Sequence, residues 1–112
     1  MNSLNTKIKT IESKAFGPFW DTMFLISLGF PDEPSWSDKS IYKTFYFIFV
    51  NLIPCGVCRH YASTKLPPLD FSSREQLFFS LYQWKSEVNA KRGVPNISFN
   101  DAKQKYYKYR LN

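Results

Sequence analysis

The sequence has few residues of the kinds that bind metals or form disulfide bridges. Its 112 residues include two cysteines, Cys55 and Cys58, and a single histidine, His60. With no third cysteine in the sequence, a scaffold of several structural disulfides is excluded. A zinc ion bound by the cysteine pair would need a second pair of ligands, and only one histidine is available. We therefore expect no metal site.

Long apolar runs are also missing. Residues 1–7 lack the apolar core of a secretory signal. The longest uncharged run, Thr44 to Cys58, is shorter than the about 20 residues of a membrane-spanning helix and contains Pro54. These features predict a soluble, cytoplasmic protein with no secretory signal and no membrane span. In that compartment a close cysteine pair is more often catalytic than structural.

Aromatic residues, by contrast, are abundant. Eleven Phe, seven Tyr and three Trp make up 19% of the chain. We expect a single domain, residues 1–112, with one modest core and a flexible N-terminal segment, residues 1–13. So many flat rings indicate a buried planar cofactor, an aromatic subunit interface or simply an aromatic-rich core. Composition alone does not choose among the three.

The net charge is +6. Most basic residues are scattered, which favours a solvated surface or attraction to an anionic cofactor or partner. Only the end of the chain resembles the mixture of basic and aromatic residues typical of nucleic-acid binding: Lys103, Lys105, Tyr106, Tyr107, Lys108, Tyr109 and Arg110. We expect no specific nucleic-acid partner.

The two cysteines form a Cys-x-x-Cys motif, Cys55 to Cys58, directly after Pro54. A bridge this local removes little entropy from the unfolded chain, so it would stabilise the fold weakly. Proline favours the first turn of a helix, where the dipole stabilises a thiolate. The motif predicts a pair that cycles between dithiol and disulfide, and two inert core cysteines are the alternative.

Apolar periodicity predicts an all-α fold, a four-helix bundle with a short fifth helix. The predicted helices are Ala15–Gly29, Asp38–Leu52, a short helix that begins at the cysteines, one opened by a capping box Ser72-x-x-Glu75 and closed by Gly93 and Pro95, and one capped by Ser98-x-x-Asp101. Residues 31–37 are predicted to be a loop. The fourth helix should bury the stripe Leu77, Leu81, Trp84 and Val88.

The second predicted helix is apolar nearly all round. One face carries Ile41, Phe45, Ile48, Phe49 and Leu52, and the other carries Tyr42, Tyr46, Phe47 and Val50. We expect the face with Phe45, Ile48 and Phe49 to enter the core and the face with Tyr42, Tyr46 and Phe47 to point away. A chain of this size cannot cover a second apolar face by itself, which predicts a non-covalent homodimer.

A thioredoxin-like dithiol–disulfide exchange protein without flavin is the alternative fold and function. Phe45 to Val50 would then be a buried strand leading to the cysteines, and Pro95 would lie against the disulfide. That fold needs two further strands, and only Asn96 to Phe99 is available.

Three blocks resemble the Erv/ALR family of flavin-linked sulfhydryl oxidases, in particular the short forms of large DNA viruses. The blocks are the aromatic start Phe16 to Trp20, the proline-led redox motif Ile53 to Ala62, and the segment Val88 to Pro95. Where the family usually has histidine this chain has Phe24, and Lys85-Ser86 replaces a His-Asn pair. Tyr61 stands where the family often has His or Asp.

The resemblance implies an FAD cofactor and residues that contact it: Phe16, Gly17, Trp20, Phe24, Cys58, Tyr61, Trp84, Lys85, Val88, Asn89, Lys91, Arg92, Phe99 and Tyr106. Phe24, Trp84 and Tyr106 could stack on the adenine, and Lys85, Lys91 or Arg92 could bind the pyrophosphate.

The resemblance also implies a reaction. A dithiol protein, or a small dithiol shuttle protein, attacks the disulfide at Cys55, and Cys58 leaves as a thiolate. FAD then passes the electrons to molecular oxygen to give hydrogen peroxide. If the protein is viral, the expected location is the host cytoplasm or the virion.

Overall fold

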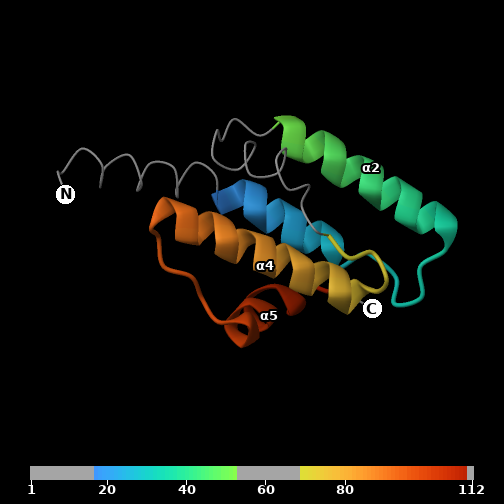
Figure 1. The fold of residues 1–112 in the computed structure, drawn as a ribbon. Coiled ribbons are helices and arrows are strands. Elements are labelled where there is room, and N and C mark those ends of the chain that lie inside the picture. The colour runs from blue at the N-terminus through green and yellow to red at the C-terminus, as the bar shows by residue number, and fades with distance from the viewer. Residues whose placement is uncertain (1–16, 53–68, 111–112) are drawn as a thin grey trace.

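The computed structural model describes residues 17–52 and 69–110, and these residues form four helices. The first helix spans residues 17–27, and it is followed by α2 (Trp36–Leu52), α4 (Arg74–Arg92) and α5 (Phe99–Tyr107) (Figure 1). The two described ranges contain no strand. The all-α prediction is therefore confirmed. The predicted cysteine-bearing helix and the predicted flexible segment 1–13 lie outside the described residues.

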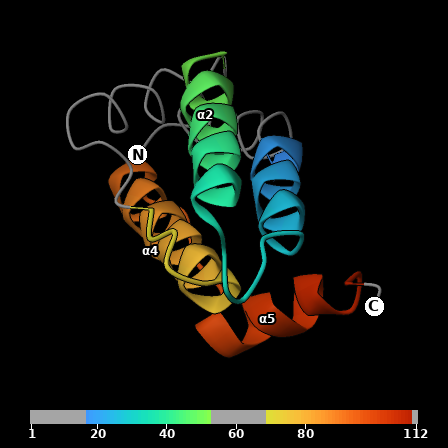
Figure 2. The same ribbon diagram turned by 90° about the vertical axis from the view of Figure 1, so that its right-hand side faces the viewer.

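The first helix, α2 and α4 are grouped together, and α5 lies below them and runs across the direction of α4 (Figures 1 and 2). A hydrogen bond links the first helix to α2, since the hydroxyl of Tyr46 donates to the carbonyl of Met23 at 2.8 Å. Ring contacts link the first helix to α4 and α5, for example between Trp20 and Trp84. The first helix is thus the element that the other three share.

The start of α2 was predicted two residues too late. The helix begins at Trp36, because Ser35 and Asp38 cap it reciprocally. The Asp38 N–H donates to Ser35 Oγ at 3.0 Å, and the Ser35 N–H donates to Asp38 Oδ2 at 2.9 Å. Residues 45–50 are helical, so the strand required by the thioredoxin-like alternative is wrong.

The ends of α4 follow local signals, with one shift at the start. Ser73, not Ser72, is the N-cap, and its Oγ accepts the N–H of Gln76 at 3.2 Å. Ser72 instead donates its N–H to Asp70 Oδ1 in the preceding turn, so its backbone belongs to that turn. Gly93 ends the helix with φ 69°, a left-handed conformation that glycine adopts without strain.

The start of α5 is confirmed. Ser98 is its N-cap, and its Oγ accepts the N–H of Asp101 at 3.1 Å. The helix ends at Tyr107, and the exposed Tyr109 lies in the turn that follows.

The orientation of α2 differs in part from the predicted one: Phe45 and Phe49 pack against the core as predicted, but Ile48 does not. Tyr46 and Val50 are buried in the core, whereas Ile48 is 51% exposed. Both predicted faces are apolar, so periodicity could not distinguish them. Tyr46 can enter because its hydroxyl donates to the Met23 carbonyl, which removes the cost of burying that group. Phe47, predicted to point away from the core, is 65% exposed.

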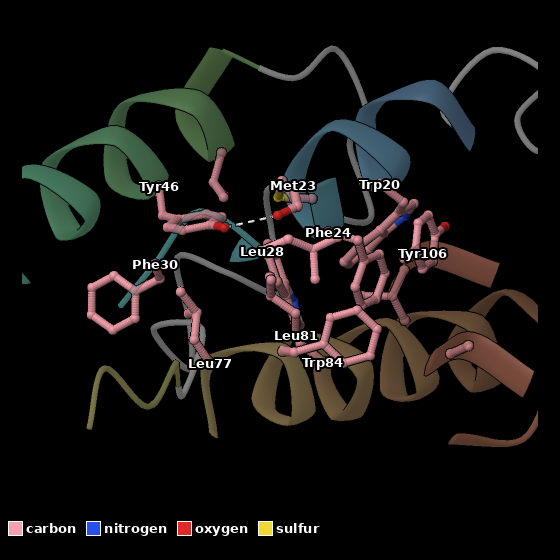
Figure 3. Close-up of a cluster of buried hydrophobic side chains, with 14 residues drawn as sticks. Trp20, Met23, Phe24, Leu28, Phe30, Tyr46, Leu77, Leu81, Trp84 and Tyr106 are labelled. Atoms are coloured by element: carbon pink, nitrogen blue, oxygen red, sulfur yellow. Dashed lines mark hydrogen bonds between the residues drawn. The ribbon is translucent and has the colours of Figure 1, made fainter. Parts of the chain in front are cut away.

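The predicted stripe of α4 is confirmed, since Leu77, Leu81, Trp84 and Val88 are each fully buried. Figure 3 shows how side chains of the first helix, α4 and α5 meet around this stripe. Among the described residues no helix is both long and apolar enough to cross a bilayer.

Candidate aromatic cofactor site

Four aromatic residues predicted to contact a flavin meet in the core. Trp20 and Phe24 come from the first helix, Trp84 from α4 and Tyr106 from α5 (Figure 3). The ring centroids of Trp20 and Trp84 lie 4.8 Å apart at 68°. Phe24 and Tyr106 are stacked, with centroids 4.7 Å apart at 15°. All four are buried. We call these four residues the aromatic site.

Helical spacing explains how these rings come together. Trp20 and Phe24 are four residues apart, so they project from the same face of the first helix. Trp84 belongs to the buried stripe of α4, which packs against that face. Tyr106 is brought in by α5, whose buried residues are Ala102 and Tyr106. Three separate elements therefore build one ring-lined site.

The indole of Trp84 contributes an unsatisfied donor. Trp84 is fully buried, and its Nε1 has no hydrogen-bond partner among the described residues. A buried donor left unpaired costs about 1–3 kcal/mol, so native proteins rarely keep one without a reason. An acceptor on a bound ligand would remove that cost. Trp84 Nε1 is therefore the donor in this cluster that an acceptor on a bound ligand could satisfy.

One edge of the site is polar and charged. The hydroxyl of Tyr106 donates a short hydrogen bond to Asp21 Oδ1, and Lys105 Nζ lies 3.7 Å from the same oxygen. Burial, and then the hydrogen bond to Asp21, raise the pKa of Tyr106 above its ordinary value. The phenol consequently remains a neutral donor at physiological pH.

Lys85 adds a partly buried cation to this edge. Its Nζ lies 5.9 Å from the centroid of the Phe24 ring, which the cation faces. Burial and the nearby charge of Lys105 lower the pKa of Lys85, while Asp21 raises it. No described carboxylate lies within ion-pair distance of Lys85. An anionic ligand beside Lys85 would add a counter-charge to that of Asp21.

The other predicted contact residues are distributed around the site. Val88 and Asn89 are buried on α4, and Arg92 is 8% exposed in its last turn. Lys91 is exposed and Gly17 half-buried.

Phe99 lies further out. It is half-buried, and its ring contacts the rings of three residues of α4, namely Phe78, Phe79 and Tyr82. It contacts the aromatic site only through Phe78, whose ring also meets Phe24 and Tyr106. Phe16, Cys55, Cys58 and Tyr61 lie outside the described residues, so their predicted roles stay predictions.

Sequence reasoning missed Asp21 and Lys105. Asp21 accepts the Tyr106 hydroxyl although the two residues are 85 positions apart. No local pattern predicts such a contact. It also missed Phe78, which is fully buried and contacts Phe24 at 5.1 Å. Its position directly after Leu77 of the buried stripe was the available signal.

Charges elsewhere on α5 are engaged within the protein. Lys103 Nζ lies 3.1 Å from Glu75 Oε1 and faces the rings of Phe99 and Tyr107. The basic and aromatic residues of this helix thus contact α4 and one another. In the part of the chain that the structure describes, no three His, Cys, Asp or Glu residues gather as a metal site would require.

These features define a class, an all-helical bundle whose core holds a cluster of aromatic rings with a charged edge. The model of the Erv1 / Alr family matches residues 18–108, and the chain belongs to this family.

Two viral proteins and one solved structure illustrate the relationship. The FAD-linked sulfhydryl oxidase of African swine fever virus (isolate Tick/Malawi/Lil 20-1/1983) is 31% identical over 102 residues, which cover 87% of this chain and 84% of that protein. A protein of invertebrate iridescent virus 3 is 29% identical over 102 residues, 87% of this chain and 69% of that protein. The FAD binding domain of Erv1 from Saccharomyces cerevisiae has the same fold, with a TM-score of 0.69 at 23% identity over 81% of this chain and 89% of that one.

Proposed function

We propose that this protein is an FAD-dependent sulfhydryl oxidase, which joins two thiols of a partner protein as a disulfide and gives hydrogen peroxide from oxygen. The observation that carries this proposal is the aromatic site, beside which the Trp84 indole N–H has no hydrogen-bond partner and the Lys85 cation no ion pair among the described residues. It occurs in a member of the Erv1 / Alr family whose viral relative is named a FAD-linked sulfhydryl oxidase.

The residues present fit FAD. The rings of the aromatic site would flank its flat ring systems, and Trp84 Nε1 would donate to an acceptor on the cofactor. Lys85 would neutralise a phosphate, as would Lys91 and Arg92 at the end of α4. The buried hydroxyl of Tyr106 stays protonated beside Asp21 and holds α5 against the first helix. When bound, FAD accepts two electrons and transfers them to oxygen.

Cys55 and Cys58 would carry the thiol chemistry. A thiolate of the partner attacks the sulfur of Cys55, so a mixed disulfide forms and Cys58 leaves as a thiolate. The partner's second thiolate then attacks the partner's sulfur in the mixed disulfide. The partner's disulfide forms, and Cys55 leaves as a thiolate. The partner has lost two electrons and gained a disulfide, and the Cys55–Cys58 pair has gained those electrons as a dithiol.

The substitutions Cys55→Ser and Cys58→Ser test this assignment. Each should abolish oxygen consumption with a reduced protein dithiol as substrate, while bound FAD and its visible absorption band remain. The retained band is the control for folding. Full turnover in either variant would contradict the role of the pair. A purified wild-type protein without flavin would contradict the cofactor.

A reduced protein, or a small dithiol shuttle protein, is the proposed substrate. The sequence has no cysteines besides this pair that could relay electrons to it. The viral origin of the relatives supports the expected location in the host cytoplasm or the virion.

We also propose a homodimer, and because Tyr46 of the expected face enters the core, we place the interface on the flank of α2 that carries Ile48 instead of the one that carries Phe47. Ile41, Ile48 and Leu52 are 63%, 51% and 74% exposed, and their spacing places them on one side of the helix. Such a stripe on a small protein is typical of an interface. A second copy would cover it symmetrically, since a twofold axis brings the same stripe from both chains together.

A further inference from the structure

We propose that Asn96 is a positioning residue for the FAD site, which fixes the side-chain amide of Asn89 so that its oxygen faces the cofactor. This inference rests on the proposed function. Asn96 belongs to the connection between α4 and α5, residues 93–98, and the family resemblance does not single it out.

The contacts of Asn96 are unusually complete for an exposed side chain. Its Oδ1 accepts a hydrogen bond from Asn89 Nδ2 at 2.8 Å. Its Nδ2 donates to Ser86 Oγ at 2.6 Å and to the hydroxyl of Tyr82 at 3.2 Å. Since Asn96 itself is exposed and buries little surface, its contribution lies in these directed bonds and not in packing.

Asn89 is held at both its backbone and its side chain. It is 6% exposed, and its carbonyl accepts the N–H groups of Gly93 and Val94 where α4 ends. Its Nδ2 donates to Asn96, so the side-chain oxygen is the end of the amide that Asn96 does not hold. Freed from Asn96, the amide could turn over and present its NH2 group instead. Asn96 therefore decides which end of this buried amide is available to a ligand.

The position of Asn89 on α4 connects this network to the aromatic site. Asn89 follows Val88 of the buried stripe and lies four residues after Lys85, hence on the same side of the helix as that cation. Tyr82, seven residues before Asn89, and Ser86, three before it, lie on the flank covered by the connection. Asn89 thus stands where the cofactor side and the network side meet.

The same network sets the approach to α5. The hydroxyl of Tyr82 donates to the carbonyl of Ile97 at 2.6 Å, and its ring lies 5.3 Å from that of Phe99, the first residue of α5. A purely structural role for Asn96, through the placement of α5, is therefore the competing explanation. The experiment must separate it from an effect through Asn89.

The test measures how fast FAD leaves the full-length holoprotein, followed by the rise in flavin fluorescence after dilution. Asn96→Ala should speed FAD release about tenfold, the effect of one misplaced hydrogen bond. Tyr82→Phe is the matched control, because it removes the bond to Ile97 and the longer of the two bonds donated by Asn96 Nδ2, but leaves Asn96 bonded to Asn89 and Ser86. Its release rate should stay within about twofold of wild type.

A double-mutant cycle identifies the route of the effect. In an Asn89→Ala background, Asn96→Ala should change the release rate no further, because Asn96 acts through the amide that has been removed. Equal acceleration in both backgrounds would overturn the inference and assign Asn96 to the placement of α5. Unchanged release in Asn96→Ala would overturn it as well. A wild-type protein that binds no FAD would overturn the proposed function and, with it, the inference. In the other two outcomes the wild type binds FAD, so only the inference fails.

Discussion

The hydrogen bond between Tyr106 and Asp21 joins α5 to the first helix, and Tyr106→Phe removes it while keeping the ring. The variant retains the stack on Phe24, at 4.7 Å and 15°, and the edge contact with Phe78. It loses only the donor to Asp21 Oδ1. Any change in stability therefore reports this bond and not the aromatic packing.

The size of the effect follows from the exposure of the acceptor. Hydrogen bonds to charged groups contribute about 1.5–3 kcal/mol. The side chain of Asp21 is 44% exposed and keeps Lys105 as a partner at 3.7 Å, so water and the ammonium compensate part of the loss. We expect a loss of about 1–1.5 kcal/mol in the free energy of unfolding. At about 4 °C per kcal/mol, Tm should fall by about 4–6 °C.

Thermal unfolding followed by circular dichroism measures this loss, with Tyr107→Phe as the matched control. Tyr107 is the next residue of α5, and its hydroxyl makes no hydrogen bond to the described residues, so its variant should stay within about 0.5 kcal/mol of wild type. In a cycle with Asp21→Ala, the Tyr106→Phe effect should largely disappear. An unchanged Tm in Tyr106→Phe, or an equal loss in Tyr107→Phe, would refute the reasoning.

Two further predictions concern assembly and pH. Ile48→Asp should convert the proposed dimer to a monomer with FAD retained, as measured by analytical ultracentrifugation. Phe47→Asp, on another side of α2, should leave the dimer intact. A dimeric Ile48→Asp protein would exclude the Ile48 flank as the interface. An anionic ligand beside Lys85 raises its lowered pKa, so FAD affinity should be constant below the pKa of the free protein and fall as pH rises through the window between the free and bound values. Lys85→Arg, which stays charged, should remove this dependence, and an unchanged pH profile in that variant would assign the titration to another group.

The helix ends could be predicted because their signals are local. Gly93 at the end of α4 and Ser98 at the start of α5 both act on residues within one turn. The start of α4 was off by one residue for a related reason. Ser72 and Ser73 both precede a residue that can complete a capping box, and only the turn formed by Asp70 decides between them.

The orientation of α2 could not be predicted from its own sequence. Its two faces are similarly apolar, so the choice depends on what each face meets across the bundle. Tyr46 finds a backbone acceptor at Met23, 23 residues earlier, and this contact is visible only once the first helix and α2 are packed. Ile48 is more apolar but remains half-exposed. Which side chain of α2 is buried therefore depends on whether a hydroxyl finds a hydrogen-bond partner, and not on hydrophobicity alone.

The rings of the aromatic site were found through the resemblance, and periodicity supported only part of it. The α4 stripe predicted that Trp84 is buried, but not that it meets Trp20. The hydrogen bond at the polar edge of the site could not be predicted from the sequence, because Asp21 and Tyr106 lie at opposite ends of the chain. Contacts of this range require the assembled fold.

The two positions where the family usually has histidine are filled here by residues that contact each other. Phe24 presents its ring to the ammonium of Lys85, 5.9 Å away, and stacks its ring on Tyr106. Histidine titrates near pH 6.5, within the physiological range. A phenyl ring does not titrate, and the pKa of Lys85 is lowered from an ordinary value of 10.5. Replacing imidazoles by this pair moves the charge change of the site towards alkaline pH. Cofactor binding should therefore follow the titration of Lys85, and Lys85→Arg tests that cation without altering its charge.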